Sequence, residues 1–227
     1  MDLTALTSAV RRQTNLTTAD VADADITAIL NEGIQEVSAI QRWDFLHTRG
    51  TINVTANTPE VNLPADFRLM DFVQQVGKRN GPLIMLSFDE YSYRFGDNAS
   101  TGSQARYFYL RTEDGTQKIG FYPTPSTTAS NEYELFYFKA PTLLSSGSDT
   151  PEWDDQYHRL LVDYASYRLW EREEYFDESE RAFRRYQRQL SDMIRYYRMR
   201  YKQVRLIVGD GAYYKSHADR RIHYGFE

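Results

Sequence analysis

The chain has 227 residues, of which 41% are hydrophobic and 26% charged, and its formal net charge is −5. This composition is that of a globular protein rather than a disordered one. The sequence contains no run of about 18 apolar residues, so no membrane span is expected, and residues 1–4 do not resemble the start of a signal peptide. It also contains no cysteine, which excludes disulfides, thiolate catalysis and Cys-based zinc sites.

Two compositional features bear on function. The chain carries 18 tyrosines and 12 phenylalanines, which indicates either extensive protein interfaces or a tyrosine-lined core. Residues 181–227 carry 12 Lys and Arg against 4 acidic residues, a net of +8, whereas residues 1–180 carry a net of −13. This split favours separate partners for the two parts, or head-to-tail attraction between copies of the chain. A solvated basic helix face is the competing explanation.

Helical periodicity dominates the N-terminal part. Leu3, Leu6 and Val10 lie at helical spacing, and a second apolar stripe with a 3.6-residue period predicts a helix over residues 23–44. We expect Asp23 or Asp25 to be the N-cap of this second helix.

From Gly50 the hydrophobic period changes to two, which predicts strands. Residues 51–55 and 60–63 are expected to pair as a hairpin, and Asp114-Gly115 is a strong signal for a second hairpin. Ser87, with Glu90 three residues later, predicts the start of a short helix over residues 87–93. Further strands are expected at residues 67–77, 83–86, 106–110, 118–122 and 132–138, with polar loops at 95–103 and 124–131.

Helices return after a linker at residues 144–149. Thr150 is expected to cap a helix that extends to about Glu174. Residues 177–180 begin another helix, in which Phe183, Tyr186, Leu190, Met193, Tyr197 and Val204 form a near-heptad stripe. The remaining residues, 212–227, are rich in aromatic and basic side chains, which favours a tail that docks elsewhere over a disordered terminus.

The order of elements predicts an α+β fold, in which an α-helical bundle from both termini carries an inserted antiparallel β-domain and an extended C-terminal tail. The expected divisions are residues 1–48 and 144–208 for the bundle, 49–143 for the β-domain and 209–227 for the tail.

The sequence shows no recognisable catalytic or cofactor motif. It has no phosphate-binding glycine loop, no nucleophile elbow, and no pair of its four histidines at metal-ligand spacing. Glu152, Asp154, Asp155 and Asp163 could serve a hydrolase, but acidic residues near a helix N-terminus also complement the helix dipole. We therefore expect no catalytic site, metal or cofactor, and the protein is predicted not to be an enzyme.

A series of segments carries a family resemblance. These segments are LPADFRLM at 63–70, PLIMLSFDEY at 82–91, KIGFYPTP at 118–125, YELFYFKAP at 133–141 and TPEWDDQYH at 150–158. Over about residues 20–175 the chain resembles the head-to-tail adaptor (connector) proteins of tailed bacteriophages, especially the short-tailed types. The basic C-terminal helix and the aromatic tail are the least matched parts.

The resemblance implies a structural protein of the virion neck that is assembled in the host bacterial cytoplasm. It implies a ring of twelve copies below the portal protein that extends the DNA channel and docks a downstream tail or nozzle protein. Passive contact with packaged DNA is compatible with the basic helix, and no membrane partner is implied. The alternatives are another neck, tail-completion or tail-tube component and, less favoured, a virion-associated cell-wall hydrolase.

Three groups of residues are the candidate contact sites. The portal-docking tail is assigned to Tyr213, Tyr214, Lys215, Arg220, Arg221, Ile222, Tyr224 and Phe226. Subunit or channel contacts are assigned to Arg184, Arg185, Arg188, Arg195, Arg198 and Lys202. Tail-side docking is assigned to the loop residues Asp97, Asn98, Ser100, Thr127, Ser130 and Asn131.

Overall fold

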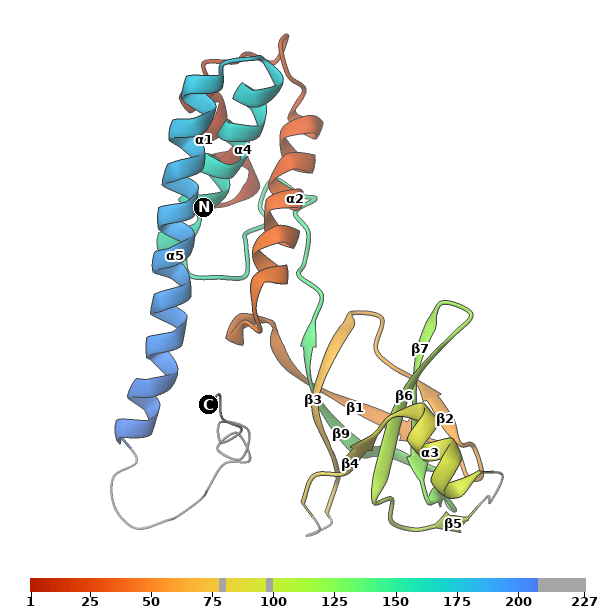
Figure 1. The fold of residues 1–227 in the computed structure, drawn as a ribbon. Coiled ribbons are helices and arrows are strands. Elements are labelled where there is room, and N and C mark those ends of the chain that lie inside the picture. The colour runs from red at the N-terminus through yellow and green to blue at the C-terminus, as the bar shows by residue number, and fades with distance from the viewer. Residues whose placement is uncertain (78–80, 97–99, 208–227) are drawn as a thin grey trace.

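The computed structural model describes residues 1–77, 81–96 and 100–207, with side chains up to Arg200. It confirms the α+β class, and Figure 1 shows the long helices gathered at one end and the strands, with one short helix, at the other. Four long helices make up the helical part. They are α1 (Leu3–Thr14), α2 (Asp23–Ile40), α4 (Arg159–Arg172) and α5 (Phe176–Ile207).

The helices share one hydrophobic core with residues from both halves of the sequence. Leu6, Leu30 and Leu161 are fully buried in it, and Tyr186 of α5 joins the same cluster. Helix α4 lies centrally, because α1, α2 and α5 all contact it. The burial of these apolar stripes, rather than helix propensity, stabilises the arrangement.

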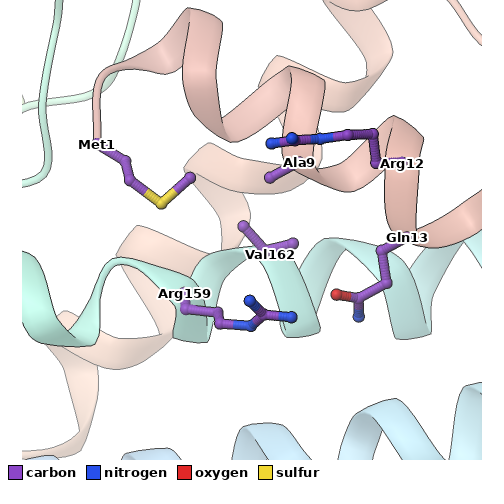
Figure 2. A pocket seen from close by; sticks show the side chains of 6 residues that line it. All are labelled: Met1, Ala9, Arg12, Gln13, Arg159 and Val162. Carbon is purple, nitrogen blue, oxygen red and sulfur yellow. The ribbon is translucent and has the colours of Figure 1, made fainter.

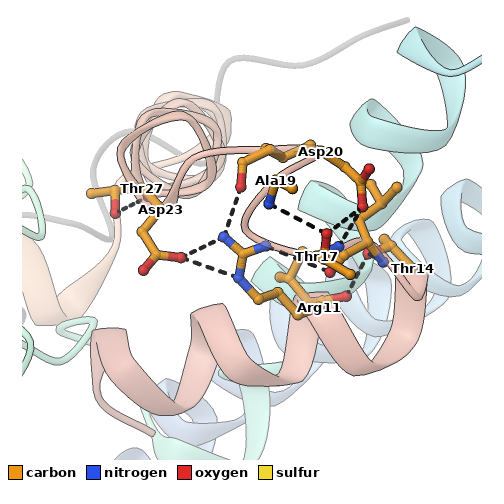
Figure 3. Close-up of polar contacts among 10 residues, drawn as sticks. Arg11, Thr14, Thr17, Ala19, Asp20, Asp23 and Thr27 are labelled. Atoms are coloured by element: carbon orange, nitrogen blue, oxygen red, sulfur yellow. Dashed lines mark hydrogen bonds and ion pairs between the residues drawn. The ribbon is translucent and has the colours of Figure 1, made fainter.

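The turn between α1 and α2 is held by polar contacts (Figure 3). The Arg11 guanidinium donates to Asp23 Oδ1 at 2.5 Å and to the carbonyl of Val21 at 2.8 Å. The expected N-cap was therefore wrong. Helix α2 begins at Asp23 itself, after Ala22, because the Asp23 carboxylate is turned toward Arg11.

Helix α2 ends at Ile40, four residues earlier than predicted. Gln41 is extended, and Trp43 folds back so that its indole Nε1 donates to the carbonyl of Val37 at 2.7 Å. The buried Trp43 stacks on Phe45 at 5.4 Å and meets the edge of Tyr197 of α5 at the same separation. The burial of Trp43 against Tyr197, a contact that no local pattern contains, accompanies the end of the helix. A 3-10 turn, η1 (Asp44–Leu46), follows.

The prediction of a helix beginning at Thr150 was also wrong. Residues 151–158 are irregular apart from the 3-10 turn η2 (Asp155–Tyr157), and α4 begins at Arg159. Trp153 packs on Phe45 at 5.7 Å, and its carbonyl lies 2.9 Å from Nε2 of the buried His158. The burial of Trp153 prevails over the helix-start signal of the sequence.

The predicted linker at 144–149 is docked on the helices rather than free. Leu144 is buried, and its backbone N–H and carbonyl both pair with the Asn31 side chain, at 2.8 and 3.0 Å. The carbonyls of Gly147 and Asp149 accept from the first turn of α1. These hydrogen bonds attach residues 144–149, which lie between the last strand and α4, to α1 and α2.

The strands form two main sheets and one short pair. The three-stranded sheet has the order β1 (His47–Val54), β9 (Ala129–Lys139), β3 (Phe67–Gln75). The four-stranded sheet has the order β2 (Glu60–Asn62), β7 (Thr116–Tyr122), β6 (Tyr107–Glu113), β4 (Ile84–Leu86). The short pair is β5 (Thr101–Gly102) with β8 (Thr124–Pro125).

The strand pairing confirms one predicted hairpin and corrects the other. Asp114 and Gly115 both have positive φ and join β6 to β7, as their sequence predicts. However, β1 pairs with β9 and β2 pairs with β7, so β1 and β2 do not form a hairpin. The two strands lie in different sheets, each with a partner that is distant in sequence.

The sheets enclose a second core, in which Val73, Ile119 and Leu135 are fully buried. The rings of Phe121 and Tyr133 stack across it at 4.0 Å. Helix α3 (Phe88–Phe95) lies on this part, and Ser87 caps it by accepting from the Glu90 N–H, as predicted. Whether the two cores are separate domains at the predicted boundaries stays a prediction.

Candidate assembly surfaces

The outer face of α5 carries a ladder of arginines. Tyr186, Met193 and Tyr197 are buried on the inner face of this helix, whereas the half-buried Leu190 and Phe183, which is 37% exposed, lie at its margin. Arg184, Arg188 and Arg195 project from the opposite side. The side chains of Arg184 and Arg195 are 74% and 68% exposed, and Arg188 is also exposed.

Arg181 belongs to this ladder, although the sequence analysis did not select it. Its side chain is 67% exposed, and Arg181, Arg188 and Arg195 are spaced seven residues apart, or about 10.5 Å along the helix. That heptad spacing was the signal that could have identified it. Between Phe176 and Arg200 the helix has seven arginines against four acidic residues.

Arg185, by contrast, takes part in an internal contact. Its Nε donates to Oδ1 of Asp163 at 3.0 Å, and the Asp163 side chain is only 1% exposed. Gln13 of α1 and Gln189 of α5 donate to the same carboxylate, at 2.8 and 2.6 Å. The predicted arginine group therefore divides into an outward set and one residue that joins α5 to α4.

Two further members of the group lie farther along α5. Arg198 is exposed, about a quarter turn from the ladder. Lys202 lies within the helix, but its side chain is outside the described part. Val204, expected in the apolar stripe, is outside it for the same reason.

The outer face of α2 has the opposite charge. The helix contains four acidic residues and no Lys or Arg. Asp23 and Glu36 are engaged within the fold, since Asp23 accepts from Arg11 and Glu36 accepts from the Tyr186 hydroxyl at 3.0 Å. Asp25 and Glu32 project to solvent, seven residues apart.

Six tyrosines of the described part are buried inside the protein. The buried tyrosines of the described part are Tyr109, Tyr133, Tyr137, Tyr164, Tyr186 and Tyr197. Burial is the main cause that raises the pKa of Tyr186, and the nearby Glu36 carboxylate raises that pKa further. Of the two explanations for the tyrosine content, the tyrosine-lined core therefore accounts for a large share.

Several of the exposed apolar residues lie on β4 and α3. Ile84 and Met85 are 58% and 55% exposed on an edge strand, and Tyr93 of α3 is 93% exposed. An edge strand with bare apolar side chains is a surface suited to contact with another protein.

The predicted polar loops are shorter than expected. Residues 124–131 are not one loop, because Thr124 belongs to β8, and Ser130 and Asn131 belong to β9. Asn131 has a positive φ and its backbone N–H donates to the Asn53 side chain, so a cross-strand contact fixes it. Thr127 remains in the turn and Ser100 precedes β5, while Asp97 and Asn98 lie outside the described residues.

The acidic residues considered for hydrolysis do not come together. Glu152 forms an ion pair with Lys139 and accepts from Thr142, whereas Asp163 faces α1 and α5. Among the described residues no group of three or more His, Asp or Glu could hold a metal ion. No helix in this part of the chain has the length and apolar character needed to cross a membrane.

A cavity of about 370 Å³ lies between α1 and α4 (Figure 2). Arg12 of α1 and Arg159 of α4 flank it, and Ala9 and Val162 form its apolar lining. The two guanidinium groups make its rim positive, in keeping with a contact for an anionic group.

The residues assigned to the portal-docking tail all lie beyond Ile207, outside the described residues. A comparison with curated proteins finds no significant match. The sequence profile of the SU10 adaptor protein family, in contrast, matches residues 1–209, which is most of the chain and includes all four long helices and both sheets. The resemblance to phage adaptors is thus confirmed, and the chain belongs to the SU10 adaptor protein family, a family of structural phage head-tail adaptors.

Proposed function

We propose that this protein is the head-to-tail adaptor of a phage virion. It forms a ring of twelve copies below the portal protein, extends the DNA channel and docks a downstream tail or nozzle protein. The family match over residues 1–209 carries this proposal.

The charge distribution of the helical part supports a ring. A closed ring of identical copies needs heterologous contacts, in which one surface of each copy meets a different surface of the next. The basic outer face of α5 and the acidic outer face of α2 are two such surfaces within one chain.

The candidate contact residues keep their assignments as part of the proposal. The tail from Tyr213 to Phe226 binds the portal, and the outward arginines of α5 make subunit or channel contacts. Tail-side contacts are made by Asp97, Asn98, Ser100, Thr127, Ser130 and Asn131. Arg185 is set apart from the outward arginines, because its partner is Asp163 of the same copy.

The place of action is the virion neck, after assembly in the bacterial cytoplasm. The absence of cysteine fits assembly under reducing conditions. Packaged DNA passes the ring with only electrostatic contact, which would be weakened by salt.

Light scattering of the purified chain, alone and with the portal protein of the same phage, tests the proposal. The full chain is compared with a version that ends at Val208. We expect the full chain to add the mass of twelve copies to the portal and the shortened version to add none.

Two other results have distinct meanings. If the full chain leaves the portal mass unchanged, the adaptor role is wrong and a tail-tube or tail-completion role replaces it. If the shortened version binds as well as the full chain, the docking role of the tail is wrong while the adaptor role stands.

A further inference from the structure

The arginine ladder of α5 and the acidic residues of α2 have the same spacing. Arg181, Arg188 and Arg195 recur every seven residues, and so do Asp25 and Glu32. At 1.5 Å per residue each interval is about 10.5 Å, so two successive arginines can face both acidic residues when the helices lie alongside one another. Arg188 is a member of either such pairing.

The two faces cannot meet within one copy. Both α2 and α5 turn their buried stripes toward α4, and Figure 1 shows them on opposite sides of the helical part. The Tyr186 hydroxyl reaches Glu36 across the inner side, which leaves Arg188 and Asp25 directed outward. Their charges therefore have to be met by solvent or by another molecule.

On each of the two faces one charged side chain has no ion-pair partner among the described residues. Among the described residues neither Arg188 nor Asp25 has an ion-pair partner, although others on the faces do. Those other pairs are exposed, and two of them are long: Arg195 with Asp192 at 3.8 Å and Glu32 with Arg168 at 3.6 Å. The pair of Arg181 with Glu178, at 3.0 Å, is shorter but also exposed. Exposed pairs of this kind exchange readily for better ones.

The shape of the α2 face also suits a helix with long side chains. Ala28 and Ala39 are exposed on it and project little from the backbone. The aliphatic stems of arginine can lie over such alanines while the guanidinium reaches the carboxylates on either side.

We propose that the heptad-spaced arginines of the α5 ladder (Arg181, Arg188, Arg195) of one copy dock on the acidic α2 face (Asp25, Glu32) of the next copy. This inference rests on the proposed function, since it names the contact that joins neighbours in the ring. It commits to a second copy of the chain as the occupant, because each face carries the charge that the other lacks.

Two charge-reversed variants test the contact. The first carries Arg188→Glu and Arg195→Glu, and the second carries Asp25→Lys and Glu32→Arg. Each should fold, as shown by circular dichroism, but each should lose the ring mass that light scattering detects for the unaltered chain with its portal. Arg172→Glu, an exposed arginine at the end of α4, is the matched control and should keep the ring.

Mixing the two variants gives the decisive result. In the equimolar mixture every α5 face meets an α2 face of opposite charge, so ring mass should return, and a single chain with all four substitutions should also form rings. The contact is wrong if either variant assembles as the unaltered chain does, or if the folded variants do not complement one another. A loss of portal binding by the unaltered chain would instead overturn the proposed function and this inference together.

Discussion

Arg185 Nε donates to Oδ1 of Asp163 at 3.0 Å, from the exposed surface of α5 to a fully buried carboxylate of α4. The carboxylate also accepts from Gln13 and Gln189, so side chains of α1 and α5 converge on this residue of α4. A buried charge with this many donors holds the helices in one arrangement and is costly to leave incomplete.

Replacing Asp163 by alanine should lower the free energy of unfolding by about 3–5 kcal/mol, because Gln13, Arg185 and Gln189 would lose their shared acceptor. Urea unfolding monitored by circular dichroism measures the change. Glu178→Ala, which removes an exposed pair with Arg181, is the control and should cost less than about 0.5 kcal/mol. A loss below about 1 kcal/mol for Asp163→Ala would show that the network contributes little.

Gly120 lies beneath the ring of Tyr109, its cross-strand partner. A Cβ at position 120 would stand 2.1 Å from Cζ of Tyr109, which forces the ring or the strand to move. Gly120→Ala should therefore destabilise the protein by about 1–3 kcal/mol in thermal or urea unfolding.

The Tyr109→Ala background provides the control for that substitution. With the ring removed, adding Gly120→Ala should cost much less than it does alone, since the two effects are coupled. Simple additivity in the double-mutant cycle would contradict the steric explanation. At Gly115 an added Cβ would meet open space, but φ is +75°. A Gly115→Ala substitution would therefore measure the cost of backbone strain rather than of a steric clash.

We expect the Tyr137 hydroxyl to contribute to a loss of protein stability at alkaline pH. It donates to Asp66 Oδ1 at 2.9 Å, and burial is the main cause that raises its pKa from 10.0 to about 12. The folded state favours the neutral phenol, so this contribution to stability is complete below about pH 10 and is lost as the pH rises to about 12. The free energy of unfolding of Tyr137→Phe should therefore fall less steeply over this interval. Parallel slopes for the two proteins would show that Tyr137 does not contribute to the loss.

Arg11 and Arg12 are neighbours with different roles. Arg11, whose side chain is 17% exposed, holds Asp23 and the carbonyl of Val21 at the α1–α2 turn, whereas Arg12 is exposed at the cavity rim. Arg11→Ala should cost about 1–3 kcal/mol in free energy of unfolding, and Arg12→Ala less than about 0.5 kcal/mol. Equal losses in urea unfolding would refute this distinction.

Local sequence patterns were sufficient to predict several secondary-structure elements. The stripe of Leu3, Leu6 and Val10, the Ser87 cap with Glu90, and the Asp114-Gly115 turn each act over a few residues, and each appears in the structure as predicted. The family could also be predicted, because it depends on an ordered series of such segments along the chain.

Only the tertiary structure decided which strands pair, where α2 ends and α4 begins, and which charged side chains have partners within the fold. The sequence identified β1 and β2 as strands, but their partners are far along the chain: paired residues lie 75 to 91 positions apart for β1 with β9 and 56 to 60 for β2 with β7. Trp43 helps to end α2 through its contact with Tyr197, and Trp153 delays α4 through its contact with Phe45, and in each pair the residues lie more than 100 positions apart. Likewise Arg185 and Arg188 are three residues apart and alike in sequence, yet one meets a buried carboxylate and the other faces solvent. Local propensity is additive along the chain, whereas burial depends on which distant surfaces meet, and the buried carboxylate of Asp163 beside Arg185 is what distinguishes these two exposed arginines.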